Sequence, residues 1–156
     1  MIDTEGYRAN VGIILVNDSG SLFWARRIGE DAWQFPQGGI RESESAEQAL
    51  FRELQEEVGV SAESVEVIGK TKDWLRYNLP KNLIRHHQVP CCIGQKQQWF
   101  LLRFIGDESE VSLNHSEKPE FDQWCWIDQM EPPRSVISFK RDVYAKALKE
   151  LLPLLN

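Results

Sequence analysis

The sequence predicts an α/β (α+β) fold in which a mixed β-sheet is packed between helices. Three observations lead to this fold class. Several short stretches are rich in β-branched and aromatic residues, two segments show the amphipathic spacing of helices, and turn-forming residues separate them. The length of 156 residues predicts a single domain covering residues 1–156.

The first elements are expected to form a β-hairpin. Residues 11–16 (VGIILV) are apolar and mostly β-branched, as in a buried strand. Turn residues at 17–20 separate them from 21–27 (SLFWARR), which we interpret as the return strand. Residues 33–36 should be a short extended piece, because Pro36 restricts the residue before it. The glycine pair at 38–39 is expected to open a loop.

The clearest helix is predicted over residues 45–58. Ser43 or Ser45 could cap its start, and Gly59 is placed to end it. The remaining chain is predicted to hold strand-like stretches in 65–77, a long loop over 78–96, strands at 99–105 and 124–127, and a second amphipathic helix over 139–152.

Three glutamates share one face of the first helix. Glu57 follows Glu53 by four residues and Glu56 follows it by three, so all three lie beside the apolar stripe that includes Leu50 and Leu54. Like charges at this spacing repel one another, and a bound divalent cation would remove the repulsion. Carboxylate oxygens suit Mg²⁺ or Mn²⁺. A solvated acidic face is the alternative for such a helix in isolation.

The sequence of residues 38–60 favours a metal site over a solvated acidic face. They read GGIRESESAEQALFRELQEEVGV, which resembles the Nudix box, the signature of hydrolases that act on nucleoside diphosphates linked to another group. Every fixed position of the pattern is present. The resemblance implies a mixed sheet between helices and a hydrolase that depends on Mg²⁺ or Mn²⁺.

The resemblance also implies roles for individual residues of the box. The glutamates Glu53, Glu56 and Glu57 would bind metal, and one of them would act as the base toward a water molecule. The resemblance leaves open which one. Arg52 would orient a catalytic carboxylate. Gly38 would let the backbone approach closely and present its carbonyl oxygen to the metal.

Segments outside the box indicate which group of Nudix hydrolases the chain resembles. The stretches GYRANVGIILVN, WQFPQGGI, IGQKQQWFLL, PEFDQW and VISFKRDVY are similar to those of the bacterial RNA 5′-pyrophosphohydrolases. This likeness implies hydrolysis of the 5′-triphosphate end of RNA, with release of pyrophosphate. The 5′-monophosphate left behind would promote mRNA decay. The alternative is a dinucleoside polyphosphate hydrolase of the diadenosine tetraphosphate type. A binding module that has lost its chemistry is disfavoured, because the box carboxylates are all present.

Five residues outside the box are candidates for the substrate and metal sites. Arg8 and Arg27 could bind phosphates, or could be ordinary surface arginines. The resemblance gives Glu120 a further metal-binding role. Phe139 could stack on a base, with Lys140 beside it on a phosphate. Phe139 could instead be the first core residue of the last helix.

Composition sets further bounds. The net charge is −6, of which residues 41–57 carry −4, so bound metal would leave a chain able to hold a polyanion. No apolar run reaches the roughly 18 residues of a membrane span. The N-terminus lacks signal-peptide features, so a cytoplasmic location is expected. Cysteines 91 and 92 lie near two histidines, but their spacing favours ordinary loop residues over a zinc site. The sequence identifies no accessory protein.

Overall fold

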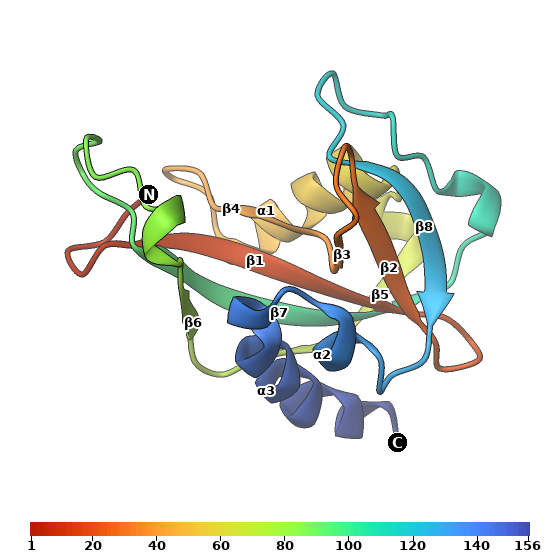
Figure 1. The fold of residues 1–156 in the computed structure, drawn as a ribbon. Helices are drawn as coiled ribbons and strands as arrows, with labels where there is room; N and C mark the ends of the chain where they lie inside the picture. Colours follow the sequence, from red (N-terminus) through yellow and green to blue (C-terminus); the bar gives the residue numbers. More distant parts are fainter.

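The computed structural model describes residues 1–156 and contains one eight-stranded mixed sheet (Figure 1). The central strands β1 and β7 pair in parallel, while their other neighbours pair with them in antiparallel fashion. The strand order is β3-β2-β1-β7-β5, with β4 also beside β1, β6 beside β7 and β8 beside β2. The strands are β1 (Tyr7–Val16), β2 (Leu22–Arg27), β3 (Trp33–Gln34), β4 (Gln37–Gly39), β5 (Val65–Lys70), β6 (Leu75–Asn78), β7 (Gly94–Phe104) and β8 (Phe121–Ile127).

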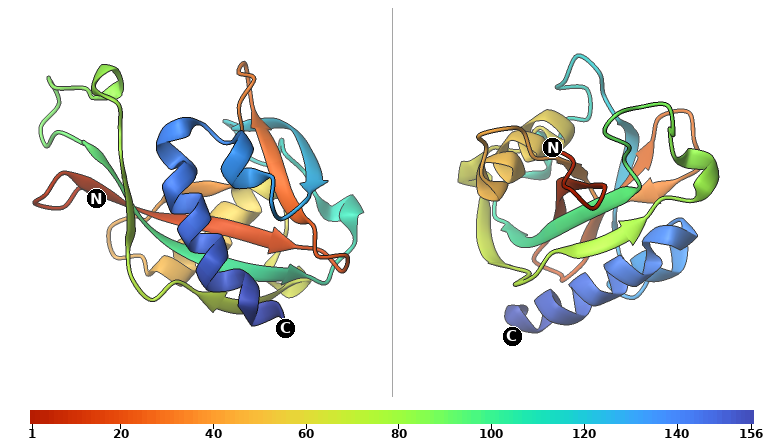
Figure 2. Two further views of the ribbon diagram at one scale, coloured as in Figure 1. Left: turned by 60° about the horizontal axis from the view of Figure 1, so that its bottom comes forward. Right: turned by 90° about the vertical axis from the view of Figure 1, so that its left-hand side faces the viewer.

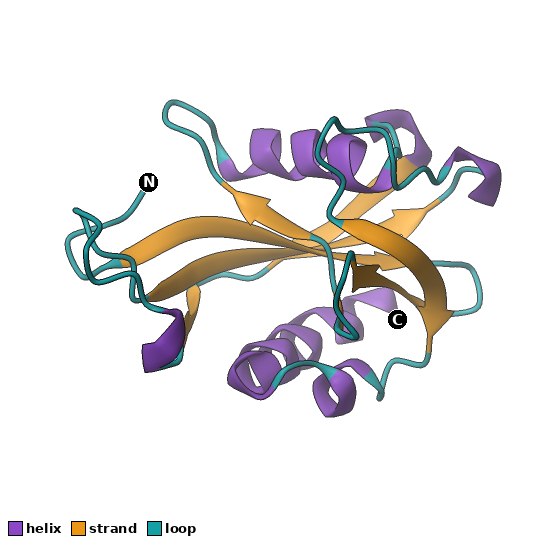
Figure 3. Cartoon of the chain, turned by 45° about the horizontal axis from the view of Figure 1, so that its top comes forward, coloured by secondary structure: helices purple, strands orange, loops and turns teal.

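Helices cover the two faces of the sheet, as the sequence predicted. Figure 3 shows the helix α1 (Ala46–Glu53) above the strands and α3 (Arg141–Leu151) below them. The short helix α2 (Pro132–Ser135) lies on the same side as α3, which crosses under the sheet toward the C-terminus (Figure 2). Single turns of 3₁₀ helix occupy Ala62–Ser64, Lys81–Leu83, Glu108–Glu110, Ser138–Lys140 and Leu152–Leu155.

The apolar run of residues 11–16 serves two hydrophobic cores at once. Successive side chains of a strand point to opposite faces. Accordingly, Ile13 and Leu15 pack in the core beneath α1, whereas Ile14 and Val16 pack in the core against α3. A strand buried on both faces is apolar throughout, which explains why this stretch shows no alternation.

Several predicted boundaries were wrong. The loop predicted over residues 78–96 is too long, because β7 begins at Gly94. The first strand begins at Tyr7 instead of residue 11, since β1 pairs with β7 from Tyr7 onward. The glycine pair at 38–39 lies in β4, where its backbone pairs with Asn10 and Val11 of β1. Backbone pairing with a distant strand overrides local propensity at each of these places.

Both predicted helices are subdivided in the structure. The first is α-helical over Ala46–Glu53 and then widens into a π turn over Leu54–Val58. The second begins with the 3₁₀ turn at Ser138–Lys140 before α3 starts at Arg141. None of the helices combines the length and the apolar character that a membrane span requires.

Candidate active site

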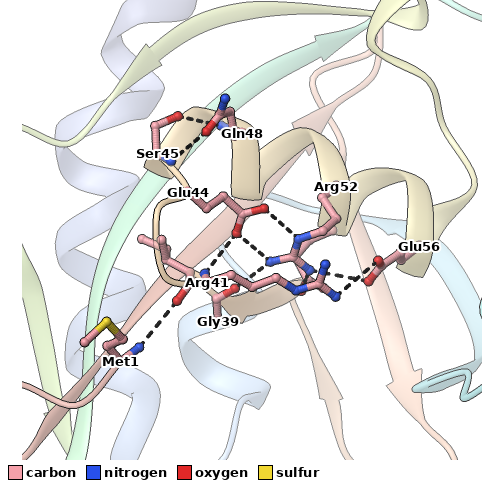
Figure 4. Close-up of polar contacts among 10 residues, drawn as sticks. Met1, Gly39, Arg41, Glu44, Ser45, Gln48, Arg52 and Glu56 are labelled. Carbon is pink, nitrogen blue, oxygen red and sulfur yellow. Dashed lines mark hydrogen bonds and ion pairs between the residues drawn. The ribbon is translucent and has the colours of Figure 1, made fainter.

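The start of α1 is fixed by a capping box. The Ser45 hydroxyl accepts a hydrogen bond from the Gln48 amide at 3.1 Å, and the Gln48 side chain accepts one from the Ser45 amide at 2.9 Å (Figure 4). Of the two caps that the sequence allowed, Ser45 is therefore the one used. Ser43 instead adopts a positive φ of 66° in the loop before it. The capping box fixes where the helix starts, and the helix then packs against β1 and β4.

The end of the helix brings the three glutamates together. Carboxylate oxygens of Glu53, Glu56 and Glu57 all lie within 4.8 Å of one another. Glu56 and Glu57 belong to the π turn, which Gly59 ends with a φ of 76°. Turns of π helix are rare and concentrate at functional sites. The shared face predicted from helical spacing is thus confirmed, although the local geometry differs from a regular α-helix.

Arg52 ties the loop before the helix to the carboxylates (Figure 4). Its guanidinium donates to both carboxylate oxygens of Glu44, at 2.8 and 2.9 Å, and to the carbonyl oxygen of Gly39 at 2.7 Å. It also donates to Glu53 at 2.7 Å and to Glu56 at 3.4 Å. The hydrogen bond from Arg52 lowers the pKa of Glu44 to about 2. Glu44 thereby orients Arg52, a role that sequence reasoning missed although Glu44 lies within the box at residues 38–60.

Gly38 lies directly against the Glu53 carboxyl group. A Cβ atom at Gly38 would overlap the carboxyl carbon and both oxygens of Glu53. The close approach that the sequence suggested for this glycine is present, because β4 passes next to the carboxylate end of α1. A backbone segment this close to a carboxylate can offer its own carbonyl oxygens to the same cation.

Two carboxyl groups at this site, those of Glu53 and Glu57, are buried, and that of Glu57 lacks a full set of hydrogen-bond partners. Glu53 is 8% and Glu57 is 6% exposed. Burial raises the pKa of both, most strongly for Glu57, whose pKa rises to about 7 with help from the charges of Glu120 and Glu53. The Oε2 atom of Glu57 is buried and has no hydrogen-bond partner. A divalent cation would supply the missing partner, so the donor set fits an oxygen-ligated metal.

Glu120 lies beside this group, although it is not among the three glutamates whose oxygens gather within 4.8 Å. It precedes β8, and its charge raises the pKa of Glu57. The backbone carbonyl of Glu120 accepts from the Ile28 amide at 2.9 Å, which fixes the segment beside the end of β2. Glu120 is exposed, yet the surrounding protein raises its pKa, and the charges of Arg27 and Lys140 oppose that rise.

A pocket of about 140 Å³ is lined by the two cations, Arg27 and Lys140, whose charges act on Glu120. Its lining includes Arg27, Phe139 and Lys140, three of the four residues predicted to bind substrate outside the box. Arg27 is exposed and forms an ion pair with Glu30 at 3.0 Å. Phe139 is half-buried, with its ring 5.7 Å from that of Tyr77. Phe139 therefore has both of the features that the sequence offered as alternatives: it contacts the core and it lines a pocket.

Arg8 does not join this pocket. It is exposed and lines a second pocket of about 200 Å³ together with Arg85 and Gln95. Leu83, from the turn after β6, lines both pockets and separates them. The structure thus divides the predicted phosphate-binding arginines between two neighbouring pockets.

Lys140 is the least exposed of the predicted substrate residues. Only 6% of its surface is exposed, and its ammonium group donates to Gln34 Oε1 at 3.2 Å and to Gln37 Oε1 at 3.4 Å. Burial lowers the pKa of Lys140 to about 8. Sequence reasoning missed both glutamines, whose signal was their place in the extended WQFPQ segment just before the box.

The cysteines and histidines of the 84–93 segment do not form a metal site. The side chains that gather at metal-binding distances are the glutamates of the box. The Cys92 thiol instead lies 3.2 Å from the carbonyl oxygen of Gly94, and the Cys91 thiol 3.9 Å from that of Arg85.

Comparison with known protein families identifies the family to which this chain belongs. The NUDIX domain family matches residues 6–147, and the chain belongs to that family. Its class is accordingly that of the Nudix hydrolases, which the box at residues 38–60 had indicated. The mixed sheet between helices is the fold expected for this class.

Curated relatives resemble the chain from end to end. An RNA pyrophosphohydrolase of Hahella chejuensis is 58% identical over 155 residues, covering 99% of this chain and 96% of the relative. One from Thioalkalivibrio sulfidiphilus is 62% identical, covering 99% of this chain and 90% of the relative.

Solved structures share the fold at much lower identity. The E. coli dihydroneopterin triphosphate pyrophosphohydrolase superposes with a TM-score of 0.72 at 21% identity, over 94% of this chain and 98% of that one. A C. elegans Ap4A hydrolase superposes with a TM-score of 0.67 at 16% identity, over the same shares of the two chains.

Proposed function

We propose that this protein hydrolyses the 5′-triphosphate end of RNA, releasing pyrophosphate and leaving a 5′-monophosphate. The observation that carries the proposal is the pocket lined by Arg27, Phe139 and Lys140, two of which act by their charge on Glu120, the neighbour of Glu57. An aromatic ring that shares a pocket with two cations suits a nucleobase with its phosphates. The relatives named RNA pyrophosphohydrolase support the same substrate.

The carboxylate group would hold the divalent cation that such hydrolysis needs. Its ligands would be Glu53, Glu56 and Glu57, with Glu120 and the carbonyl oxygen of Gly38. When bound, Mg²⁺ or Mn²⁺ polarises the phosphoryl group and lowers the pKa of a water molecule. Support comes from the buried Glu57 Oε2, which lacks any partner within the protein.

The chain's own residues would divide the remaining work. Arg52 holds the Glu53 carboxylate in place through its 2.7 Å hydrogen bond and is itself fixed by Glu44. One glutamate of the group accepts the proton of the attacking water. The cations Arg27 and Lys140 bind phosphates, and Phe139 stacks on a base near the RNA 5′ end. We propose further that residues 1–156 form a single catalytic domain and that it acts in the cytoplasm on RNA destined for decay.

A direct assay tests the substrate. Purified protein with magnesium is given triphosphorylated RNA, and release of pyrophosphate or phosphate is followed beside formation of the 5′-monophosphate end. Diadenosine tetraphosphate is assayed in parallel at the same concentration. We expect faster turnover of the RNA. No magnesium-dependent release from RNA, with rapid cleavage of the dinucleotide, would overturn the proposal.

A dinucleoside polyphosphate hydrolase is the second candidate. The observation in its favour is the pocket beyond Leu83, where Arg8 and Arg85 could hold the charges of a second nucleotide. The fold likeness to an Ap4A hydrolase is compatible with it. Because both candidates need the same carboxylates, the parallel assay and not metal dependence separates them.

A further inference from the structure

A row of polar side chains is buried among the aromatic residues of the core against α3. Asn10 of β1 and Gln97 of β7 are paired across the parallel strands and are 4% and 1% exposed. Gln97 Nε2 donates to Asn10 Oδ1 at 2.8 Å and to Gln37 Oε1 of β4 at 3.4 Å. Because a buried polar group without a partner is costly, each amide in the row needs one defined orientation.

Trp99 fixes the orientation of this row at one end. An indole N–H can only donate, and that of Trp99 donates to Gln97 Oε1 at 3.2 Å. The Gln97 carbonyl oxygen must therefore face Trp99, which turns its amide nitrogen toward Asn10 and Gln37. Gln37 in turn must present its oxygen to Gln97 and its nitrogen to the Tyr77 hydroxyl, which it reaches at 3.4 Å.

Lys140 closes the other end. Its ammonium group is also only a donor, and it meets the Gln37 oxygen that the row has turned toward it, at 3.4 Å. A second neutral acceptor, Gln34 Oε1, lies at 3.2 Å. Since both acceptors are uncharged amides, they fix the position of the ammonium group without neutralising it. Two of its three protons are engaged, which leaves the third for an anionic ligand.

We infer that Trp99 and Gln97 are positioning residues, which act through Gln37 to hold the Lys140 ammonium group at the substrate pocket. The inference rests on the proposed function, because it assumes that Lys140 binds a phosphate of the RNA 5′ end. Neither residue lines the pocket, so each would affect substrate binding only through the lysine.

The test replaces Gln97 by methionine, which has a similar length but can neither donate nor accept as the amide does. In Gln97→Met the KM for triphosphorylated RNA should rise about five- to tenfold, while kcat changes less than about twofold, because a hydrogen bond that orients a ground-state contact is lost. Trp99→Phe keeps an aromatic ring in the core and should change KM in the same direction.

Trp24→Phe is the matched control. Trp24 is 2% exposed in the same core and contacts Tyr144 as Trp99 does, but it has no place in the amide row. A general loosening of this core would raise KM equally in Trp24→Phe and Gln97→Met. Equal shifts in KM at equal losses of Tm would overturn the inference.

A double-mutant cycle asks whether Gln97 acts through the lysine. In a Lys140→Met background, Gln97→Met should change KM by less than about twofold, because the group that it positions is absent. An undiminished effect would show that Gln97 acts by another route.

A readout without RNA separates this inference from the proposed function. The ¹³Cε resonance of Lys140, measured by NMR in the free protein, should move in Gln97→Met and stay in place in Trp24→Phe. If it moves and the wild-type protein does not cleave RNA, the proposed function fails and the positioning role stands. If the wild type cleaves RNA and the resonance does not move, the positioning role fails.

Discussion

Gly38 lies so close to the carboxyl group of Glu53 that any side chain at position 38 would collide with it. The positions of β4 and of the carboxylate end of α1 therefore depend on each other, although Gly38 and Glu53 are fifteen positions apart in the sequence. Gly39, the next residue, has no atom within 4 Å of the Cβ position that a substitution would add. The glycine pair thus contains one sterically required member and one that is free of this constraint.

Replacing Gly38 by alanine should displace the Glu53 carboxylate and reduce turnover by about a hundredfold, since small misplacements of a catalytic group have effects of this size. Gly39→Ala is the matched control and should retain most of the activity. The measurement is kcat/KM on triphosphorylated RNA together with a melting curve for both variants. Equal activities of the two variants would show that the contact with Glu53 is unimportant for catalysis.

Glu53→Gln and Glu57→Gln should each lower turnover by about two to four orders of magnitude while leaving the fold intact. An amide oxygen is a weaker ligand for a divalent cation, and an amide cannot act as the base. Circular dichroism checks the fold and a magnesium-dependent assay checks turnover. Rates near that of the wild type in both variants would remove these residues from the proposed metal site.

Without metal, the stability of the protein should fall as the pH rises from about 4.5 to about 7. The ordinary pKa of glutamic acid is 4.5, and that of Glu57 in the folded chain is about 7. The folded state therefore holds this proton more tightly than the unfolded state does, and the advantage disappears as the pH passes the folded value. The loss from Glu57 should be roughly 3 kcal/mol, because the two pKa values differ by about 2.5 and each pKa unit is worth about 1.4 kcal/mol. Glu44, with a lowered pKa of about 2, gives the opposite slope below pH 4.5.

Melting curves in the presence of chelator at several pH values between 4.5 and 8 measure this effect. Glu57→Gln should flatten the profile, because the titrating group is gone. Adding magnesium to the wild type at pH 8 should raise Tm by more than it does in Glu57→Gln. A metal-free profile that does not depend on pH in this range would contradict the burial argument for Glu57.

The sequence predicted the carboxylate group well because its members lie close together along the chain. Spacings of three and four residues place Glu53, Glu56 and Glu57 side by side in an α-helix. The π turn starts only at Leu54, so it changes the geometry without separating the three side chains. The role of Arg52, in contrast, was implied by the resemblance to the Nudix box and not by helical spacing.

The environment of Lys140 could not be predicted in the same way. Its partners, Gln34 and Gln37, are more than a hundred residues away in sequence. The start of β7 was missed for a related reason. Its GQKQQ sequence is polar where a strand is expected to be apolar, because Gln97 takes part in a buried hydrogen-bonded row instead of apolar packing. The roles of these residues depend on tertiary contacts, and the local sequence pattern does not show those contacts.

Phe139→Ala addresses the substrate, and the structure sharpens the test. The Phe139 ring lines the pocket beside Arg27 and Lys140, and it also packs against Tyr77 at 5.7 Å. If Phe139 stacks on a base, its loss should lower kcat/KM for triphosphorylated RNA by roughly five- to more than a hundredfold, as expected for about 1–3 kcal/mol of stacking. A free nucleoside triphosphate has no following base, so its hydrolysis should be much less affected. Leu152→Ala provides the control, because Leu152 is likewise a partly buried residue of the same core but lies away from the pocket. Both variants should lose some thermal stability, and only Phe139→Ala should discriminate between the two substrates. Equal losses on RNA and on the free triphosphate, in proportion to the fall in Tm, would show that Phe139 is only a core residue.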